Sequence, residues 1–141
     1  MNDIISALKN SFEVYEPFKS GGDHGEKITA IEQNPSITVV EAKSQLDELN
    51  MQIGKKNEAA IRASDIVVAI LDGMPEDTGV SAEIGFAYAL GKKIFGLRYD
   101  FRYCADNLGS IINLQVHYFI RASGGKITKS IEELVKELAQ L

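Results

Sequence analysis

The sequence is poor in residues that mark several classes of protein. Its 141 residues include one cysteine, Cys104, and no tryptophan. A single cysteine cannot form an internal disulfide, which excludes a disulfide-stabilised scaffold and favours a reducing, cytoplasmic location. Two histidines, His24 and His117, complete the set of imidazole and thiol groups. Three such groups are too few for a His/Cys metal site, so we expect no bound metal.

Positive charge and long apolar runs are also scarce. Lysine and arginine number 15 against 20 acidic residues, which gives a formal net charge of −5. An acidic chain with scattered basic residues has no electrostatic footprint for nucleic acid. The longest apolar run, residues 66–71, is far shorter than the about 20 residues of a membrane helix. The N-terminus also lacks the pattern of a signal peptide. We therefore expect a cytoplasmic protein with a small-molecule ligand and neither a nucleic-acid nor a membrane partner.

What is present is the composition of an ordinary globular protein. The 45% hydrophobic and 25% charged fractions are typical of folded chains. A length of 141 residues matches one domain of about 150 residues, so we expect residues 1–141 to form a single domain.

Apolar patterning predicts strands that alternate with helices. Candidate strands are residues 12–16, 65–71, 93–97 and 117–120. Candidate helices are residues 4–8, 40–63, 80–90 and a last helix after Ser130, where a capping-box spacing begins. Residues 19–26 are glycine-rich and predict a loop. Alternation of this kind predicts an α/β fold with a doubly wound, mostly parallel sheet of four to five strands and helices on both faces.

Acidic residues gather just after the most apolar strand. Asp72, Glu76, Asp77 and Glu83 fall within twelve positions that lead from residues 65–71 into the next helix. In parallel α/β sheets ligands bind beyond the carboxyl ends of the strands, which is where these acids lie. No dinucleotide-binding, phosphate-loop or serine-hydrolase motif competes with them.

Glu83 is the strongest catalytic candidate. Near the positive end of a helix we expect its ionised form to be favoured, and an oriented carboxylate is a plausible nucleophile for a sugar C1′. Asp72 and Asp77 are placed to bind sugar hydroxyls or to pass a proton, and Gly79 leaves room for a ligand. The alternative is structural, because acids in the first turn of a helix commonly stabilise it. His117 is expected in a strand, facing the core or hydrogen-bonded, and His24 in a solvated loop.

The motifs of residues 63–94, ASDIVVAILDG followed by DTGVSAEIGFAYALGKKI, resemble the nucleoside 2-deoxyribosyltransferases. Shorter matches follow at residues 98–102, 112–114 and 123–126, so the resemblance covers about residues 53–140. These enzymes are flavodoxin-like α/β proteins related to nucleotide N-glycoside hydrolases. The resemblance implies transfer of 2-deoxyribose between nucleobases without metal or dissociable cofactor.

The resemblance assigns roles to individual residues. It implies that Glu83 is the nucleophile that holds the sugar as an ester, and that Asp77 is a ligand or proton donor. Asn113 matches an asparagine that reaches into a neighbouring subunit, which implies a homodimer or a higher homo-oligomer. Asn57 stands where the family commonly has an aspartate. The substrate-binding set predicted in this way is Asp72, Gly73, Gly79, Ser81, Asn57 and Asn113.

The family's first strand has no counterpart in this sequence. Members begin with a central strand and a turn of the type Tyr-Leu-Ala-Gly-Pro-Leu-Phe, whereas Met1 here begins in the helix that would follow. We therefore expect residues 12–16 to pair directly with residues 65–71, or a partner chain to help.

Three functions follow from these patterns. The first is deoxyribosyl transfer from a nucleoside to a free base through Glu83. The second is hydrolysis of the N-glycosidic bond of a nucleoside or nucleoside monophosphate, for which Arg98 and Arg102 are the candidate phosphate ligands. The third is a nucleoside- or nucleotide-binding module without turnover.

Overall fold

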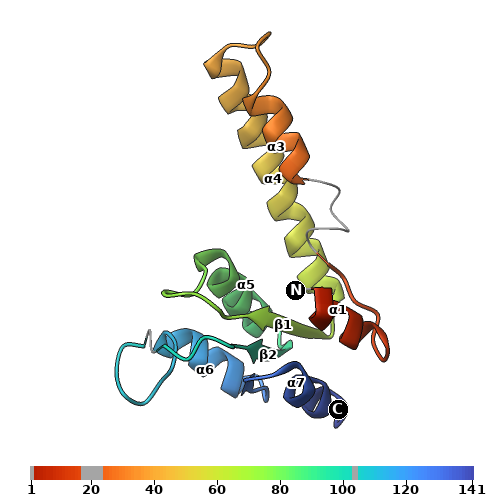
Figure 1. The fold of residues 1–141 in the computed structure, drawn as a ribbon, viewed down its shortest axis with the longest axis vertical. Coiled ribbons are helices and arrows are strands. Elements are labelled where there is room, and N and C mark those ends of the chain that lie inside the picture. Colours follow the sequence, from red (N-terminus) through yellow and green to blue (C-terminus); the bar gives the residue numbers. More distant parts are fainter. Residues whose placement is uncertain (1, 17–23, 103–104) are drawn as a thin grey trace.

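The computed structural model describes residues 2–16, 24–102 and 105–141, so Cys104 lies outside the described residues. Helices and strands alternate along the chain (Figure 1). In order they are α1 (Asn2–Lys9), α3 (His24–Glu32), α4 (Val39–Ala63), β1 (Ile66–Ile70), α5 (Thr78–Ala89), β2 (Lys93–Leu97), α6 (Leu114–Ala122), β3 (Ile127–Thr128) and α7 (Ile131–Leu138). Within these ranges no helix is long and apolar enough to cross a membrane.

The sheet is parallel, as predicted. Its strand order is β1-β2-β3, with Ile66 opposite Lys93 in the first pair and Gly96 opposite Ile127 in the second. The described part of the chain contributes three strands to this sheet, against the four to five expected.

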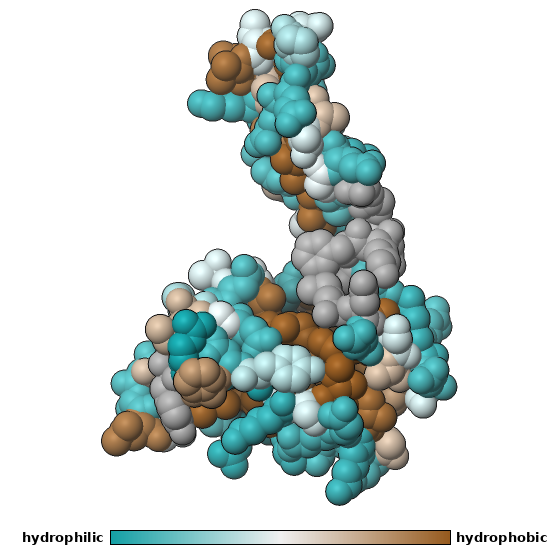
Figure 2. Space-filling model, viewed as in Figure 1, coloured by the Kyte–Doolittle hydropathy of each residue, from teal (hydrophilic) through white to brown (hydrophobic). Residues whose placement is uncertain are grey.

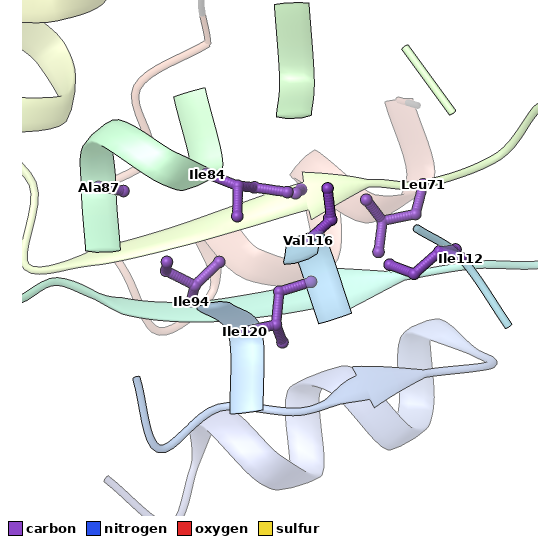
Figure 3. Packing of buried hydrophobic residues seen from close by; sticks show 8 residues of the cluster. Leu71, Ile84, Ala87, Ile94, Ile112, Val116 and Ile120 are labelled. Carbon is purple, nitrogen blue, oxygen red and sulfur yellow. The ribbon is translucent and has the colours of Figure 1, made fainter. Parts of the chain in front are cut away.

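Helices cover both faces of the sheet. Helices α5 and α6 contact one face, and α1 and α7 lie against the other. The first core cluster fills the α5–α6 face (Figure 3) and consists of Ala69, Leu71, Ile84, Ala87, Ile94, Ile112, Val116 and Ile120. The second core cluster fills the opposite face and consists of Ile4, Leu8, Phe95, Leu97, Leu134 and Leu138.

Strand β2 shows why a run of apolar residues specifies this layering. Successive side chains of a strand point to opposite faces. Ile94 accordingly joins the first core cluster, whereas Phe95 and Leu97 join the second. A strand covered on both faces needs apolar residues at every position, which is the pattern that predicted it. Truncating a fully buried residue such as Ile94 to alanine would cost about 2–5 kcal/mol.

Helices α3 and α4 form an arm that projects from the sheet (Figure 1). Helix α4 runs within one residue of its predicted bounds, and Thr38 and Glu41 form a capping box at its start. The Thr38 amide donates to Glu41 Oε2 at 2.7 Å, and the Glu41 amide donates to Thr38 Oγ1 at 3.2 Å. Hydrophilic side chains cover most of the visible arm (Figure 2), and Leu49 is the buried residue of α4.

Two predicted strands are wrong. Residues 12–16 form neither a helix nor a strand, and the predicted pairing with residues 65–71 does not occur. Their apolar side chains, Phe12 and Val14, pack on the second core cluster, while Glu16 is buried and pairs with Lys9. The alternating pattern of residues 12–16 therefore reflects side chains that pack on the core, although the backbone of this segment pairs with no strand of the described sheet.

Residues 117–120 lie inside helix α6. Val116 and Ile120 are four positions apart and face the core, which is helical spacing that a four-residue window does not reveal. His24, expected in a loop, is the first residue of α3. The two-residue strand β3 was not predicted, because it is too short to carry a periodic pattern.

Candidate active site

The turn from β1 into α5 is built by its polar residues. Gly73 follows the strand with a φ of +113°, a conformation that side chains other than glycine rarely adopt. Asp77 then caps α5, because its Oδ1 accepts from the Val80 amide at 2.9 Å. The Ser81 hydroxyl donates to the Asp77 carbonyl at 3.0 Å. Gly79 is exposed in the first turn, where an added Cβ would stand 3.0 Å from Asp77 Oδ1.

Glu83 lies in the second turn of α5 and is half-buried. Its Oε1 accepts from Asn57 Nδ2 of α4 at 3.1 Å, and its Oε2 makes no hydrogen bond within the described ranges. Burial raises the pKa of Glu83, the Asn57 bond lowers it, and the negative charge of Asp77 raises it. The net direction is upward, whereas the sequence predicted that the helix end would favour the ionised form. Desolvation in the second turn outweighs the helix dipole, which acts mainly within the first turn.

The structure therefore brings Asn57 and Glu83 together from positions 26 residues apart. Asn57 was predicted as a substrate ligand, and in this structure its amide is a hydrogen-bond donor to the candidate nucleophile. No pattern in a single sequence gives this contact, because it depends on how α4 packs against α5.

Asp72 joins the ends of β1 and β2. Its Oδ1 accepts from the Tyr99 amide at 2.7 Å and from the Asp100 amide at 2.9 Å. In the described part of the chain Asp72 makes no hydrogen bond to Glu83. Its carboxylate thus has a structural role that is sufficient to explain its position.

Arg98 is buried where the sequence proposed a phosphate ligand. Its guanidinium donates to the carbonyls of Leu71, Gly73 and Arg102, the last two at 3.2 and 2.8 Å. Burying a guanidinium is costly unless its donors are satisfied, and here backbone carbonyls of the β1 and β2 loops accept from both of its terminal nitrogens.

Arg102 is also engaged by the protein. Its Nε donates to Asp100 Oδ1 at 2.9 Å, and this contact holds the pKa of Asp100 well below its usual range. Both predicted phosphate ligands are therefore bonded to protein acceptors, and both line one hollow at the end of β2.

Asn113 caps helix α6. Its Oδ1 accepts from the amides of Gln115 and Val116 at 2.9 and 3.3 Å. The backbone amide of Asn113 donates to Glu76 Oε1 at 3.2 Å, and the Glu76 side chain is 6% exposed. The proposed reach of Asn113 into a neighbouring subunit stays a prediction.

His117 has a structural contact on helix α6 and is not part of the acidic turn between β1 and α5. Its Nδ1 lies 2.7 Å from Ser110 Oγ, and burial followed by the charge of Arg121 lowers the pKa of its imidazole. The hydrogen-bonded role agrees with prediction, although the residue is in a helix rather than a strand.

Two hollows lie away from Glu83. One of about 180 Å³ opens at the end of β2, and its lining includes both predicted phosphate ligands, Arg98 and Arg102, beside Tyr99, Phe101 and Lys129. The other, of about 480 Å³, lies beside His117, Arg121 and Lys126. Neither is lined by Glu83 or Asn57. Among the residues that the structure describes, no three His, Cys, Asp or Glu side chains are grouped to hold a metal ion.

Comparisons with known proteins agree with the sequence motifs. The model of the nucleoside 2-deoxyribosyltransferase family matches residues 1–115. A crystal structure of a conserved protein from Enterococcus faecalis V583 is similar over 87% of this chain and 89% of that chain, with 23% identity and a TM-score of 0.55. This likeness agrees with the predicted flavodoxin-like α/β fold. No curated protein matches the sequence.

A second solved structure is less similar. The CMP N-glycosidase BcmB from Clostridium botulinum aligns over 70% of this chain and 93% of that chain, with 23% identity and a TM-score of 0.46. A TM-score below 0.5 does not establish a common fold.

Proposed function

We propose a function for this chain, which belongs to the nucleoside 2-deoxyribosyltransferase family. It transfers 2-deoxyribose from a nucleoside to a second nucleobase through Glu83. The observation that carries this assignment is the environment of one carboxylate. Glu83 is half-buried, one of its oxygens accepts a single side-chain hydrogen bond, and Oε2 makes none within the described ranges. A partly desolvated carboxylate with one oxygen that is not hydrogen-bonded to other described residues is suited to nucleophilic attack.

The reaction is a double displacement at C1′ of the sugar. An oxygen of Glu83 forms a bond to C1′ while the C1′–N bond breaks, and the base leaves with the electron pair and takes up a proton. The resulting ester joins the sugar to Glu83. A nitrogen of the second base then attacks C1′ and gives up its proton, the bond between C1′ and the Glu83 oxygen breaks, and the carboxylate is restored. Two inversions retain the configuration at C1′.

Asp77 is the residue beside Glu83 with spare hydrogen-bonding capacity. Its Oδ1 caps the helix, while Oδ2 makes no hydrogen bond in the described part of the chain. We assign Oδ2 to a sugar hydroxyl or to the proton of the leaving base. The proximity of Asp77 also raises the pKa of Glu83, which makes the ionised nucleophile more basic.

A nucleoside is favoured over a nucleotide as the donor. The two arginines near the strand ends are bonded to carbonyl groups and to Asp100. A phosphate would have to compete with these protein acceptors for the guanidinium groups, which a nucleoside does not require.

Base exchange is the test. The purified chain is incubated with a deoxynucleoside and a different free base, and products are separated by chromatography. We expect the exchanged nucleoside from the wild type and from Glu48→Gln, a matched exposed glutamate on α4. We expect none from Glu83→Gln. Exchange by Glu83→Gln at the wild-type rate would contradict the assignment, and release of free base without exchange would identify a hydrolase.

A further inference from the structure

Asn57 stands apart from the other candidate residues because it contacts the nucleophile. It lies on α4, near the base of the arm, and is half-buried. Its Nδ2 reaches Glu83 Oε1 at 3.1 Å, a normal hydrogen-bond distance. An amide donor aimed at a carboxylate stabilises the ionised form and restrains the rotation of the carboxyl group.

Few other groups act on this carboxylate. Asp77, at the start of the same helix, is the charged residue that affects it within the described ranges. Arg62, at the end of α4, pairs with Glu58 at 2.8 Å and lies 5.0 Å from the centre of the Phe86 ring. These contacts direct the guanidinium elsewhere, so it does not supply the positive charge that would hold Glu83 ionised.

Within the described ranges, the other elements that pack on α5 carry no charged residue that shifts the pKa of Glu83. Strand β1 has only apolar residues. Helix α6 presents Tyr118 and Phe119 to Tyr88 of α5, with ring centroids 6.0 and 4.8 Å away. The basic end of β2, Lys93, is at its start, opposite Ile66 and therefore far from the carboxyl end of the sheet. Among the residues that the structure describes, the neutral amide of Asn57 is thus the group that lowers the pKa of Glu83 against its desolvation.

We propose that Asn57 is a positioning residue that keeps Glu83 ionised and holds its Oε1, so that Oε2 is the attacking oxygen. This inference rests on the proposed function, because it assumes that Glu83 is the nucleophile. An amide donates this hydrogen bond at every pH, whereas an aspartate, the residue that the family commonly has at this position, donates one only in its protonated form. An aspartate at position 57 would place a second negative charge about 3 Å from Glu83, and two carboxylates that close share a proton.

The test compares Asn57→Asp, Asn57→Leu and Asn57→Gln with Gln52→Glu. The control makes the same amide-to-carboxylate exchange as the first variant, at an exposed position on the same helix. Two quantities are measured for each protein: the pKa of the Glu83 carboxyl group by carbon NMR without substrate, and the pH profile of kcat/KM. Circular dichroism checks that each variant is folded.

We expect the acid limb of the profile to move up by about one pH unit or more in Asn57→Asp and Asn57→Leu. Each unit is about a tenfold loss of kcat/KM on the acid side of the limb. Asn57→Gln retains an amide and should recover part of the shift, and Gln52→Glu should follow the wild type. The pKa of Glu83 measured by NMR should move in the same order.

The two measurements separate the inference from the proposed function. If Asn57→Asp and Asn57→Leu leave both the pKa of Glu83 and the pH profile at wild-type values, Asn57 does not position Glu83. The same conclusion follows if Gln52→Glu shifts them equally. If the NMR pKa shifts as expected while no variant, including the wild type, exchanges bases, the contact is upheld and the proposed function fails.

Discussion

Two groups of charged side chains lie near the end of β1, and they differ in their hydrogen-bond partners. Asp72 and Arg98 bond to backbone groups of the loops that follow β1 and β2. Glu83 bonds to a single side chain and retains an oxygen without a partner in the described ranges. A charged group whose bonding capacity is used by backbone atoms is explained by the fold. One that is partly desolvated and incompletely bonded is a candidate for chemistry.

Removing the charge of Glu83 tests whether this residue belongs to the catalytic group. We expect Glu83→Gln to lower kcat for base exchange by at least about 10³-fold, because the nucleophile is lost. Burial raises the pKa of Glu83 in the folded protein, so its ionised form at pH 7 opposes folding relative to a neutral group. The melting temperature of the variant at pH 7 should therefore equal or exceed that of the wild type. A large fall in melting temperature would show that Glu83 is structural.

Removing the guanidinium of Arg98 tests whether this residue belongs to the structural group. Arg98→Met leaves the carbonyls of Leu71, Gly73 and Arg102 without this donor in a buried place. We expect the free energy of unfolding to fall by about 2–4 kcal/mol, measured by urea denaturation. Residual activity should follow the folded fraction. A variant of wild-type stability that has lost activity would move Arg98 into the catalytic group.

The comparison also shows what a sequence can and cannot reveal. Helix α4, strands β1 and β2, and helix α5 were predictable because each is long enough to carry a periodic pattern or a cap. The failures were short segments: residues 12–16 and 117–120 satisfy a strand pattern over four or five positions, and packing decides otherwise. The motif predicts a catalytic role for Glu83, which stays a prediction, whereas its bond to Asn57 has no signature in the sequence.

The roles of Glu76 and Arg98 were likewise hidden in the sequence. Both are buried, at 6% and 3% exposed, although charged residues are ordinarily expected on the surface. Their partners are backbone groups of loops distant in sequence, such as the Asn113 amide for Glu76. Contacts of this kind follow from tertiary structure and have no local signature.

A smaller effect is expected at Asp72. Asp72→Ala removes the acceptor for the Tyr99 and Asp100 amides, and those amides lie at the surface where water can replace it. We expect a loss of about 1 kcal/mol in urea denaturation and a kcat within a few-fold of the wild type. A loss of kcat as large as that of Glu83→Gln would instead place Asp72 at the substrate.

The smallest effect is expected at Asp100, whose pKa is held well below its usual range by hydrogen bonds from Arg102. A lowered pKa in the folded state adds stability above the pKa of the unfolded chain, about 3.9, and this is lost as the pH falls through the folded value. Asp100→Asn should therefore melt slightly below the wild type at pH 7 in low salt. The difference should shrink in 1 M salt and below about pH 4. A difference that persists under both conditions would indicate a role other than the ion pair.

Chemical trapping identifies the nucleophile directly. A 2-fluoro-arabinosyl nucleoside slows both displacements, so that the glycosyl ester accumulates and can be located by digestion and mass spectrometry. We expect one adduct, on the peptide that contains Glu83, and none on the Glu83→Gln variant. An adduct on another carboxylate such as Asp77, or an exchange-active enzyme in which Glu83 is never labelled, would contradict this expectation.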